Sequence, residues 1–133
     1  GSAPAAEFPS PLLLLAATRG RMMELIARAL RPQDSAFHDR AFVAGILSLV
    51  NALLGMPMSE ILGSMPVPAE VRSALVERAG NLGAMLLLVE ALEEAELIGI
   101  EKALDRVPGL EHGPVMGMQI EAMRWANSIG EPA

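Results

Sequence analysis

The sequence predicts an all-α domain, and three observations support this fold class. Residues 41–60, AFVAGILSLVNALLGMPMSE, form a helix-length segment with almost no polar face, and such a helix must be surrounded by other elements. No stretch of the chain alternates apolar and polar residues with the period of two of a half-buried strand. The connections between apolar runs are short, as in helical bundles. We therefore expect a compact bundle of about five to seven helices around one central apolar helix.

The first predicted helix has a clear beginning and end. Ser10 followed by Pro11 is an N-cap with proline at the first helical position. The apolar run behind it, LLLLAATRGRMMELIARAL, predicts a helix over residues 11–30, which Pro32 ends.

The second predicted helix contains the apolar segment itself. Asp34 or Ser35 caps it, and it runs through residue 54 to Gly55, where a left-handed C-cap costs least. A short helix fits residues 58–63 before two prolines break the chain.

Four further helices are expected in the second half of the chain. One begins at Pro68, has acidic Glu70 in its first turn, and ends at Gly80. Asn81 caps the next one. The last three predicted helices cover residues 82–97, 100–107 and 115–128.

The length of the chain suits one domain. It has 133 residues and a mass of 14.1 kDa, enough for one hydrophobic core and too little for two. We expect a single helical domain over residues 10–130. Residues 1–9, GSAPAAEFP, have no periodicity, so we expect a tag remnant and a disordered arm there. The opening Gly-Ser is typical of a protease scar, which suggests an excised fragment.

Composition excludes several classes of partner. The net charge is −6, with only 10 Lys and Arg scattered along the chain, whereas nucleic-acid backbones are bound by clustered basic side chains. Aromatic residues make up 3%, too few for a base-stacking platform. The apolar run at residues 12–17 is far shorter than the roughly 20 residues that span a bilayer. We expect neither nucleic acid nor a membrane as partner.

Motifs of catalysis and cofactor binding are missing from the sequence. There is no cysteine, so there is no disulfide or thiolate, and the chain suits a cytoplasmic protein. The phosphate-loop, dinucleotide, nucleophile-elbow and HExxH patterns do not occur. We expect no catalytic residue and no cofactor.

His38-Asp39 is the one dipeptide that invites an enzymatic reading. Adjacent His and Asp form the core of HD-type metal-dependent phosphohydrolases, but such a site needs at least three converging ligands. No His precedes His38, and His112 lies some 70 residues further on. We expect no metal site, and interpret His38 and Asp39 as polar residues near a helix N-terminus. A degenerate phosphohydrolase remains the alternative.

Four carboxylates crowd the end of the helix predicted over residues 82–97. Glu90 and Glu94 share one face, and Glu93 and Glu96 lie between and beyond them. Such a run is most often a solvated face. The alternatives are a carboxylate pair for acid–base chemistry and an acidic patch that docks a basic surface of another domain.

Two kinds of residue interrupt the apolar helices. Asn51 breaks the apolar segment, and because a buried amide without partners costs about 1–3 kcal/mol, we expect it to bond to a neighbouring helix end or loop. The alternative is a regulatory or ligand contact. Gly45 and Gly83 predict close approach of helices, at a propensity cost of about 1 kcal/mol each.

Several segments in this order resemble the later half of the HDOD domain family, the "HD-related output domains" of bacterial signalling proteins. They are R-x-R-M-M-E-L, F-V-x-G-I-L-S-L-x-x-A-L-L-G-M-P-M, M-P-V-P-x-E-V-R-x-A-L, G-N-L-G and A-M-R-W-A. The resemblance covers roughly residues 10–129. It is closest to the branch in which an HDOD domain follows an EAL-type cyclic di-GMP phosphodiesterase domain. Asn51 stands where that pattern has Asp, an exchange that nothing in the sequence explains.

The resemblance implies an HD-domain-like helical fold that has lost its metal ligands. It implies a non-catalytic regulatory output module of a bacterial signalling protein, linked to cyclic di-GMP and acting through other protein domains. A small-ligand sensor with its pocket between the methionine-rich elements is a further alternative. The family's earlier helices are missing here, so we expect exposed apolar surface and self-association. The expected interaction surface comprises Leu12, Leu15, Met22, Met23, Ile26, Glu90 and Glu94.

Overall fold

The computed structural model describes residues 10–129; the arm expected at residues 1–9 and the last residue of the predicted domain, residue 130, lie outside this range. Within it, every regular element is an α-helix, which confirms the predicted all-α fold class. The helices are α1 (Pro11–Leu30), α2 (Ser35–Leu47), α3 (Val50–Leu54), α4 (Met58–Leu62), α5 (Ala69–Glu77), α6 (Gly80–Glu94), α7 (Leu97–Asp105) and α8 (His112–Ile129).

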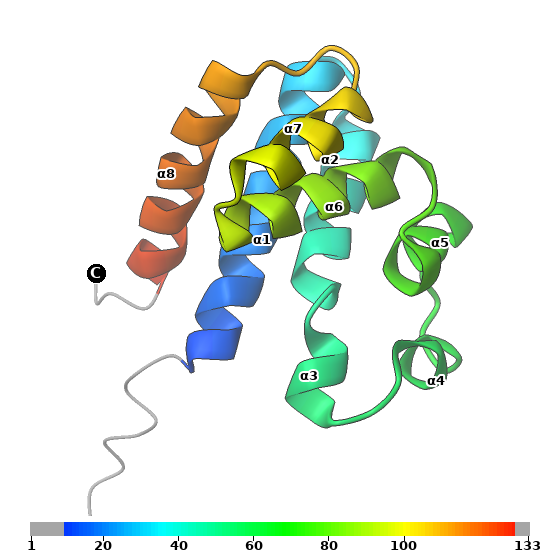
Figure 1. The fold of residues 1–133 in the computed structure, drawn as a ribbon. Helices are drawn as coiled ribbons and strands as arrows, with labels where there is room; N and C mark the ends of the chain where they lie inside the picture. Colours follow the sequence, from blue (N-terminus) through cyan, green and yellow to red (C-terminus); the bar gives the residue numbers. More distant parts are fainter. Residues whose placement is uncertain (1–9, 130–133) are drawn as a thin grey trace, which may run out of the picture.

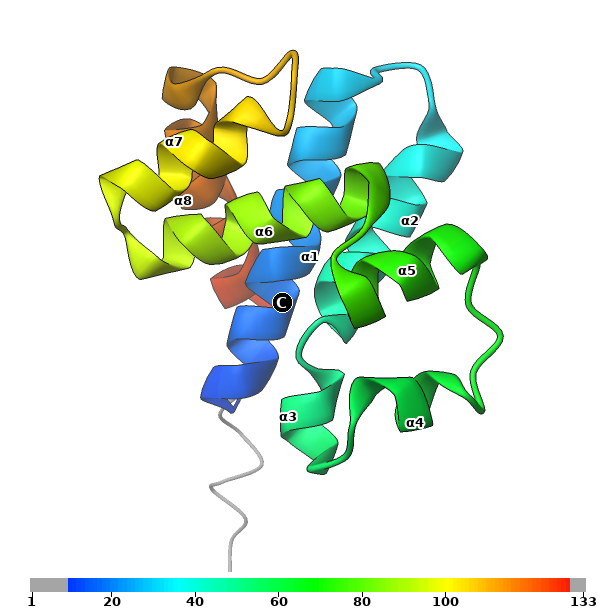
Figure 2. The ribbon, with the colours of Figure 1, turned by 45° about the vertical axis from the view of Figure 1, so that its right-hand side comes forward.

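Helix α1 lies between two antiparallel neighbours. α2 packs along one side of it and α8 along the other, so the three helices form one layer (Figure 1). α6 crosses α1 on the face of this layer, with α7 folded back beside it and α5 against its first half (Figure 2). The short helices α3 and α4 extend from the end of α2.

The core lies where α6 crosses α1 and α2. The fully buried side chains with the largest volumes come from these three helices and from the elements that flank them. They are Phe37, Met23, Ile26, Leu62, Leu82, Met85, Leu86, Leu88, Val71 and Val115. Apolar burial at this crossing is the main favourable contribution to folding.

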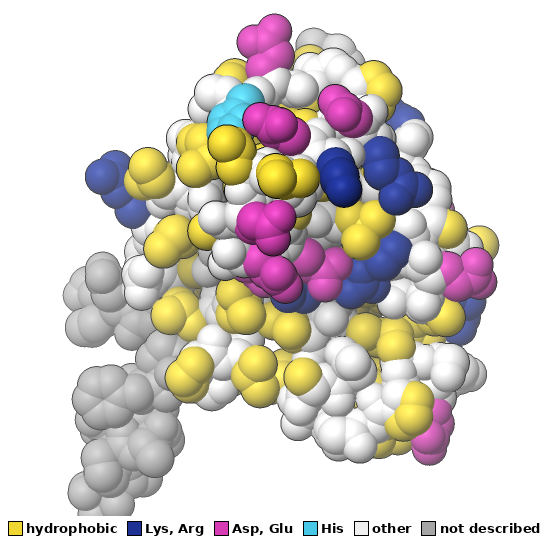
Figure 3. All heavy atoms as spheres, in the orientation of Figure 1, with side chains coloured by type: hydrophobic (Ala, Val, Ile, Leu, Met, Phe, Trp, Pro, Cys, Tyr) yellow, Lys and Arg dark blue, Asp and Glu magenta, His cyan; other side chains and the backbone are white. Residues whose placement is uncertain are grey.

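The most buried apolar helix is α6, so the expectation that residues 41–60 form the centre was wrong. α2 buries its first three turns, but no residue of α3 is buried. Leu54 is 58% exposed, and Figure 3 shows apolar side chains gathered around the lower ends of α1 and α3. By length and composition alone, the stretch Ser35–Leu54 could cross a membrane, a criterion that core helices also meet; 33% of it is buried.

A break at Ser48 divides the predicted second helix into α2 and α3. The Ser48 hydroxyl donates to the carbonyl of Gly45 at 2.7 Å and accepts from Arg19 Nη1 at 3.1 Å. A hydroxyl that bonds back to the preceding turn bends or ends a helix. α3 then ends at Gly55, which has φ of 66° and forms the left-handed C-cap that the sequence predicted.

Asn51 does not have the buried structural role that was expected. It is exposed on α3, where its backbone carbonyl accepts from the amides of Gly55 and Met56. The prediction of a buried amide was wrong because this part of the apolar segment lies at the surface.

Glycines allow two close backbone approaches, as predicted for Gly45 and Gly83. A Cβ atom on Gly45 would lie 2.5 Å from the carbonyl oxygen of Arg19 and 2.6 Å from the Cα atom of Gly20. A Cβ atom on Gly83 would overlap the backbone of Arg78. The contact of α1 with α2 therefore depends on glycine at position 45.

We predict that Gly45→Ala lowers the free energy of unfolding by about 1–3 kcal/mol, because the added methyl group meets backbone that cannot move aside. Gly117→Ala is the matched control, since a Cβ atom there has no neighbour within 4 Å; it should be neutral or stabilising by up to about 1 kcal/mol. Urea unfolding measures both. Equal stabilities of the two variants would contradict the close approach.

Candidate functional site

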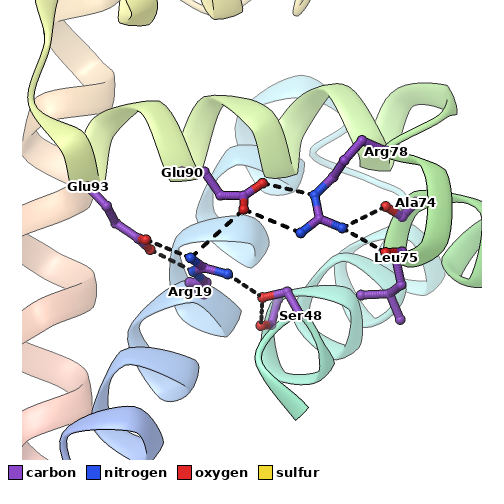
Figure 4. A network of polar contacts seen from close by, with 8 residues as sticks. Arg19, Ser48, Ala74, Leu75, Arg78, Glu90 and Glu93 are labelled. Atoms are coloured by element: carbon purple, nitrogen blue, oxygen red, sulfur yellow. Dashed lines mark hydrogen bonds and ion pairs between the residues drawn. The ribbon is translucent and has the colours of Figure 1, made fainter. Parts of the chain in front are cut away.

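A buried arginine joins three helices. Arg19 of α1 is 7% exposed, and its Nε and Nη2 donate to the two carboxylate oxygens of Glu93 in α6, each at 2.7 Å (Figure 4). Its Nη1 donates to Ser48 at the end of α2. Burial lowers the pKa of Arg19, but the hydrogen bond and charge of Glu93, with the charge of Glu90, outweigh it and raise that pKa. Arg19 is therefore a permanent cation, and each of its three nitrogens donates a hydrogen bond.

A second arginine extends this network to α5. Arg78 follows α5 with φ of 54°, and its Nε donates to Glu90 at 2.9 Å. Its Nη1 donates to the carbonyls of Ala74 and Leu75 at the end of α5. These bonds offset the cost of a left-handed conformation at a residue with a side chain. They also show why α5 ends before Arg78 rather than at Gly80.

The carboxylates at the end of α6 do not form one solvated face. Glu93 pairs with Arg19. Glu90 pairs with Arg78 and also lies 4.0 Å from Arg19. The prediction was wrong for Glu90, which is half-buried, whereas Glu93 is paired with Arg19 but remains exposed. Glu94 and Glu96 are exposed, as a solvated face requires. Glu94 and Glu96 have no ion pair among residues 10–129, whereas the paired Glu93 also lines a surface groove between α1 and α8.

His38 and Asp39 are placed near the start of α2 but face different surroundings. His38 is 5% exposed, and its Nε2 lies 2.6 Å from the carbonyl oxygen of Arg31. A carbonyl only accepts, so Nε2 carries the proton and closes the connection from α1 to α2. Asp39 is exposed. Among residues 10–129, no three His, Cys, Asp or Glu side chains cluster as metal ligands would.

A groove runs between α1 and α8 and forms the candidate interaction site. It has a volume of 530 Å³ and ends at Glu93. Its walls are Leu14, Leu15 and Thr18 of α1 and Gln119, Met123 and Asn127 of α8. We call this the α1–α8 groove. Beside it, α8 presents exposed apolar side chains at a helical spacing, Met116, Ile120 and Met123.

The polar side chains of the α1–α8 groove already have partners within the chain. Thr18 donates to the carbonyl of Leu14 at 2.8 Å, Gln119 donates to that of Leu92 at 3.4 Å, and Asn127 donates to that of Met123 at 2.9 Å. Gln119 and Asn127 each keep one N–H and the amide oxygen for a further partner. The other wall residues, Leu14, Leu15 and Met123, offer apolar contact.

Ion pairs and an aromatic contact hold α8 on α1. Arg21 bonds to Glu24 at 2.9 Å, lies 3.6 Å from Glu121, and places its guanidinium 5.8 Å from the centre of the Trp125 ring. Trp125 meets Phe42 of α2 edge to face. Burial raises the pKa of Glu24, but hydrogen bonds from Arg28 and Arg21 outweigh it, so that pKa is lowered.

The structure brings together only part of the predicted interaction surface. Leu15 lines the α1–α8 groove, and Leu12 is 37% exposed beside it. Met22, Met23 and Ile26 are buried in the core, so they were wrongly assigned to the surface. They belong to the buried hydrophobic cluster shared by most of the helices, which leaves them unavailable to a partner.

The contribution of α8 to the α1–α8 groove was not predicted from the sequence. The spacing of Met116, Ile120 and Met123 marks an apolar stripe on this helix. A stripe alone does not say whether it faces the core or the solvent. The core-facing side of α8 proves to be Val115, Ala122 and Ala126.

We predict that Glu93→Gln lowers the free energy of unfolding by about 1–2 kcal/mol, because the buried Arg19 loses its counter-charge. Glu94→Gln, one residue away and exposed, should stay within about 0.5 kcal/mol of the parent. Urea unfolding of both variants tests this difference. Two small and equal changes would mean that Arg19 needs no carboxylate.

The ion pairs of Glu24 should make the free energy of unfolding depend on pH in the acidic range. The pKa of Glu24 in the folded chain lies below its ordinary value of about 4.3. The ion pairs therefore add fully to the free energy of unfolding above about pH 4.3, and this contribution is lost as the pH falls through the folded-state pKa. Glu24→Gln should therefore unfold more easily at pH 7 and lose less stability on acidification. Unfolding curves over a pH series, with exposed Glu101→Gln as control, measure this; parallel curves for all three proteins would contradict it.

Comparison with known proteins finds a relative that matches nearly all of this chain. A protein of Vibrio cholerae serotype O1 named "Cyclic di-GMP phosphodiesterase CdgJ" is 31% identical to this chain over 121 residues. The match covers 91% of this chain but 27% of that protein, so the chain spans about a quarter of the relative's length. No protein-family model matches the chain. No solved structure matches it significantly.

Proposed function

We propose that this chain is a non-catalytic regulatory module, the later half of an HDOD domain, in a cytoplasmic bacterial protein of cyclic di-GMP signalling. It acts by contact with other protein domains. The observation that carries the proposal is the extent of the match to the named phosphodiesterase: nearly all of this chain aligns with about a quarter of that protein. Three quarters of the relative are therefore left for other domains, among which the proposal places the phosphodiesterase activity.

The chemistry of the described residues supports contact rather than catalysis. In the alternative, a degenerate HD-type phosphohydrolase, His38 would have to bind a metal. Its Nε2 is instead committed to the carbonyl of Arg31, and Asp39 lies on the exposed side of α2. Metal analysis separates the two functions: stoichiometric Mn, Fe, Ni or Zn that is lost on His38→Ala would favour the phosphohydrolase.

The partner that fits the α1–α8 groove is an amphipathic helix of another domain. Apolar side chains at positions i, i+3 and i+7 of such a helix would meet Leu14, Leu15 and Met123 along the groove. Glu94 and Glu96 are exposed on the last turn of α6 and beyond it, near the end of the groove that Glu93 closes. Basic residues on the flank of the incoming helix would complement these carboxylates.

In the isolated chain, the uncovered groove should cause self-association. We predict that light scattering of the wild-type chain gives a mass that rises with concentration, since exposed apolar patches drive association. Met123→Glu places a charge in the groove and should give a monomer at all concentrations. Val76→Glu is the control, because Val76 is 44% exposed on α5, on the opposite side of the fold from α8 (Figure 1).

The same two variants test the regulatory role. In the full-length protein that carries this chain, Met123→Glu should change the rate of cyclic di-GMP turnover, whereas Val76→Glu should not. Circular dichroism checks that both variants keep their helices. A wild-type chain that is monomeric at high concentration, or two variants with equal effects on turnover, would contradict docking at the α1–α8 groove.

A further inference from the structure

A second, smaller pocket lies on another part of the fold. It has a volume of 180 Å³ and lies where the end of α1, the start of α6 and the end of α7 meet. Arg31 and Arg106 line it together with Asn81, and Phe37 and Met85 form apolar walls. None of the residues that line it is acidic. We call it the arginine pocket.

The two arginines of this pocket differ from most others in the chain. Arg19, Arg28 and Arg78 each bond to a carboxylate at 2.9 Å or less. Arg106 has no ion pair among residues 10–129, and the single ion pair of Arg31 is long, 3.8 Å to Asp34. In an acidic chain, two guanidiniums therefore line one pocket whose lining residues include no carboxylate, with Asp34 lying 3.8 Å from Arg31.

The preference for cations at helix ends accounts for the position of each arginine in the sequence. It does not explain why both arginines line the same pocket. Arg31 follows α1 and Arg106 follows α7, and cations are favoured at the ends of helices. That effect acts on each helix separately. It does not require two side chains 75 positions apart in sequence to line the same pocket. The amide of Asn81 adds a third polar group at the pocket.

The arginine pocket is also partly preorganised. The guanidinium of Arg31 lies 4.0 Å from the centre of the Phe37 ring, and Phe37 is fully buried. Stacking on a fixed ring holds the guanidinium plane in one orientation, so less entropy is lost when the guanidinium binds a ligand. Met85 in the wall is likewise buried.

We propose that the arginine pocket binds a phosphate monoester group. Guanidinium forks match the oxygens of a phosphate in pairs, and two of them complement its charge of about −1.5 to −2 at pH 7. The apolar wall accepts the organic group next to the phosphate. This site is separate from the α1–α8 groove and does not depend on the function proposed there.

The test is a titration of the whole chain, followed by amide chemical shifts and by thermal unfolding at constant ionic strength. Inorganic phosphate and GMP carry the group in free and esterified form, and cyclic di-GMP carries only phosphodiesters. We expect saturable shifts at Arg31, Asn81 and Arg106, with a dissociation constant on the order of 1 mM for phosphate. Tighter binding of GMP would identify a nucleotide as the source of the phosphate, and equal binding would identify the free ion.

Charge variants separate this site from non-specific attraction. Arg106→Gln should weaken binding about tenfold, because it removes a charge-assisted pair of hydrogen bonds. Arg124→Gln removes the same charge from the exposed surface of α8 and should leave binding unchanged. The inference would be overturned by an absence of saturation, by equal loss in the two variants, or by cyclic di-GMP binding better than both inorganic phosphate and GMP.

Discussion

The buried guanidinium of Arg19 is the interaction on which the rest of the structure depends. Apolar burial holds α1, α2 and α6 together but has no direction, whereas a buried cation must have its donors paired in a definite geometry. Glu93 provides two acceptors from α6 and Ser48 provides one from the end of α2. These bonds fix how α6 crosses α1. They also fix the break after α2, because the same Ser48 hydroxyl bonds back to Gly45.

Local sequence signals predicted the helices well, but they could not predict which side chains far apart in sequence pair with each other. Ser10 and Gly55 act through their own turns, so their roles could be predicted directly from the sequence. Arg19 and Glu93 are 74 positions apart, and no local pattern links them. The same limit explains the error at Asn51: an apolar run predicts a helix but does not say which of its turns face the core. For the candidate site, Leu15 was predicted and the contribution of α8 was not.

Helix α1 connects the two surfaces to which we assign contacts. Its first turns form one wall of the α1–α8 groove, and the residue that follows its last turn, Arg31, lines the arginine pocket. Arg19 lies between these two ends. A partner helix in the groove and an anion in the pocket would therefore both act on a single rigid element that α6 holds in place.

The most direct test of this account is a double-mutant cycle between Arg19 and Glu93. The free energy of unfolding is measured for Arg19→Met, for Glu93→Gln, for the double variant and for the wild type. If the bidentate pair holds α6 on α1, the sum of the two single losses will exceed the loss in the double variant by a coupling energy of at least about 1 kcal/mol. Additive losses, with a coupling energy near zero, would contradict the claim that this pair fixes the crossing.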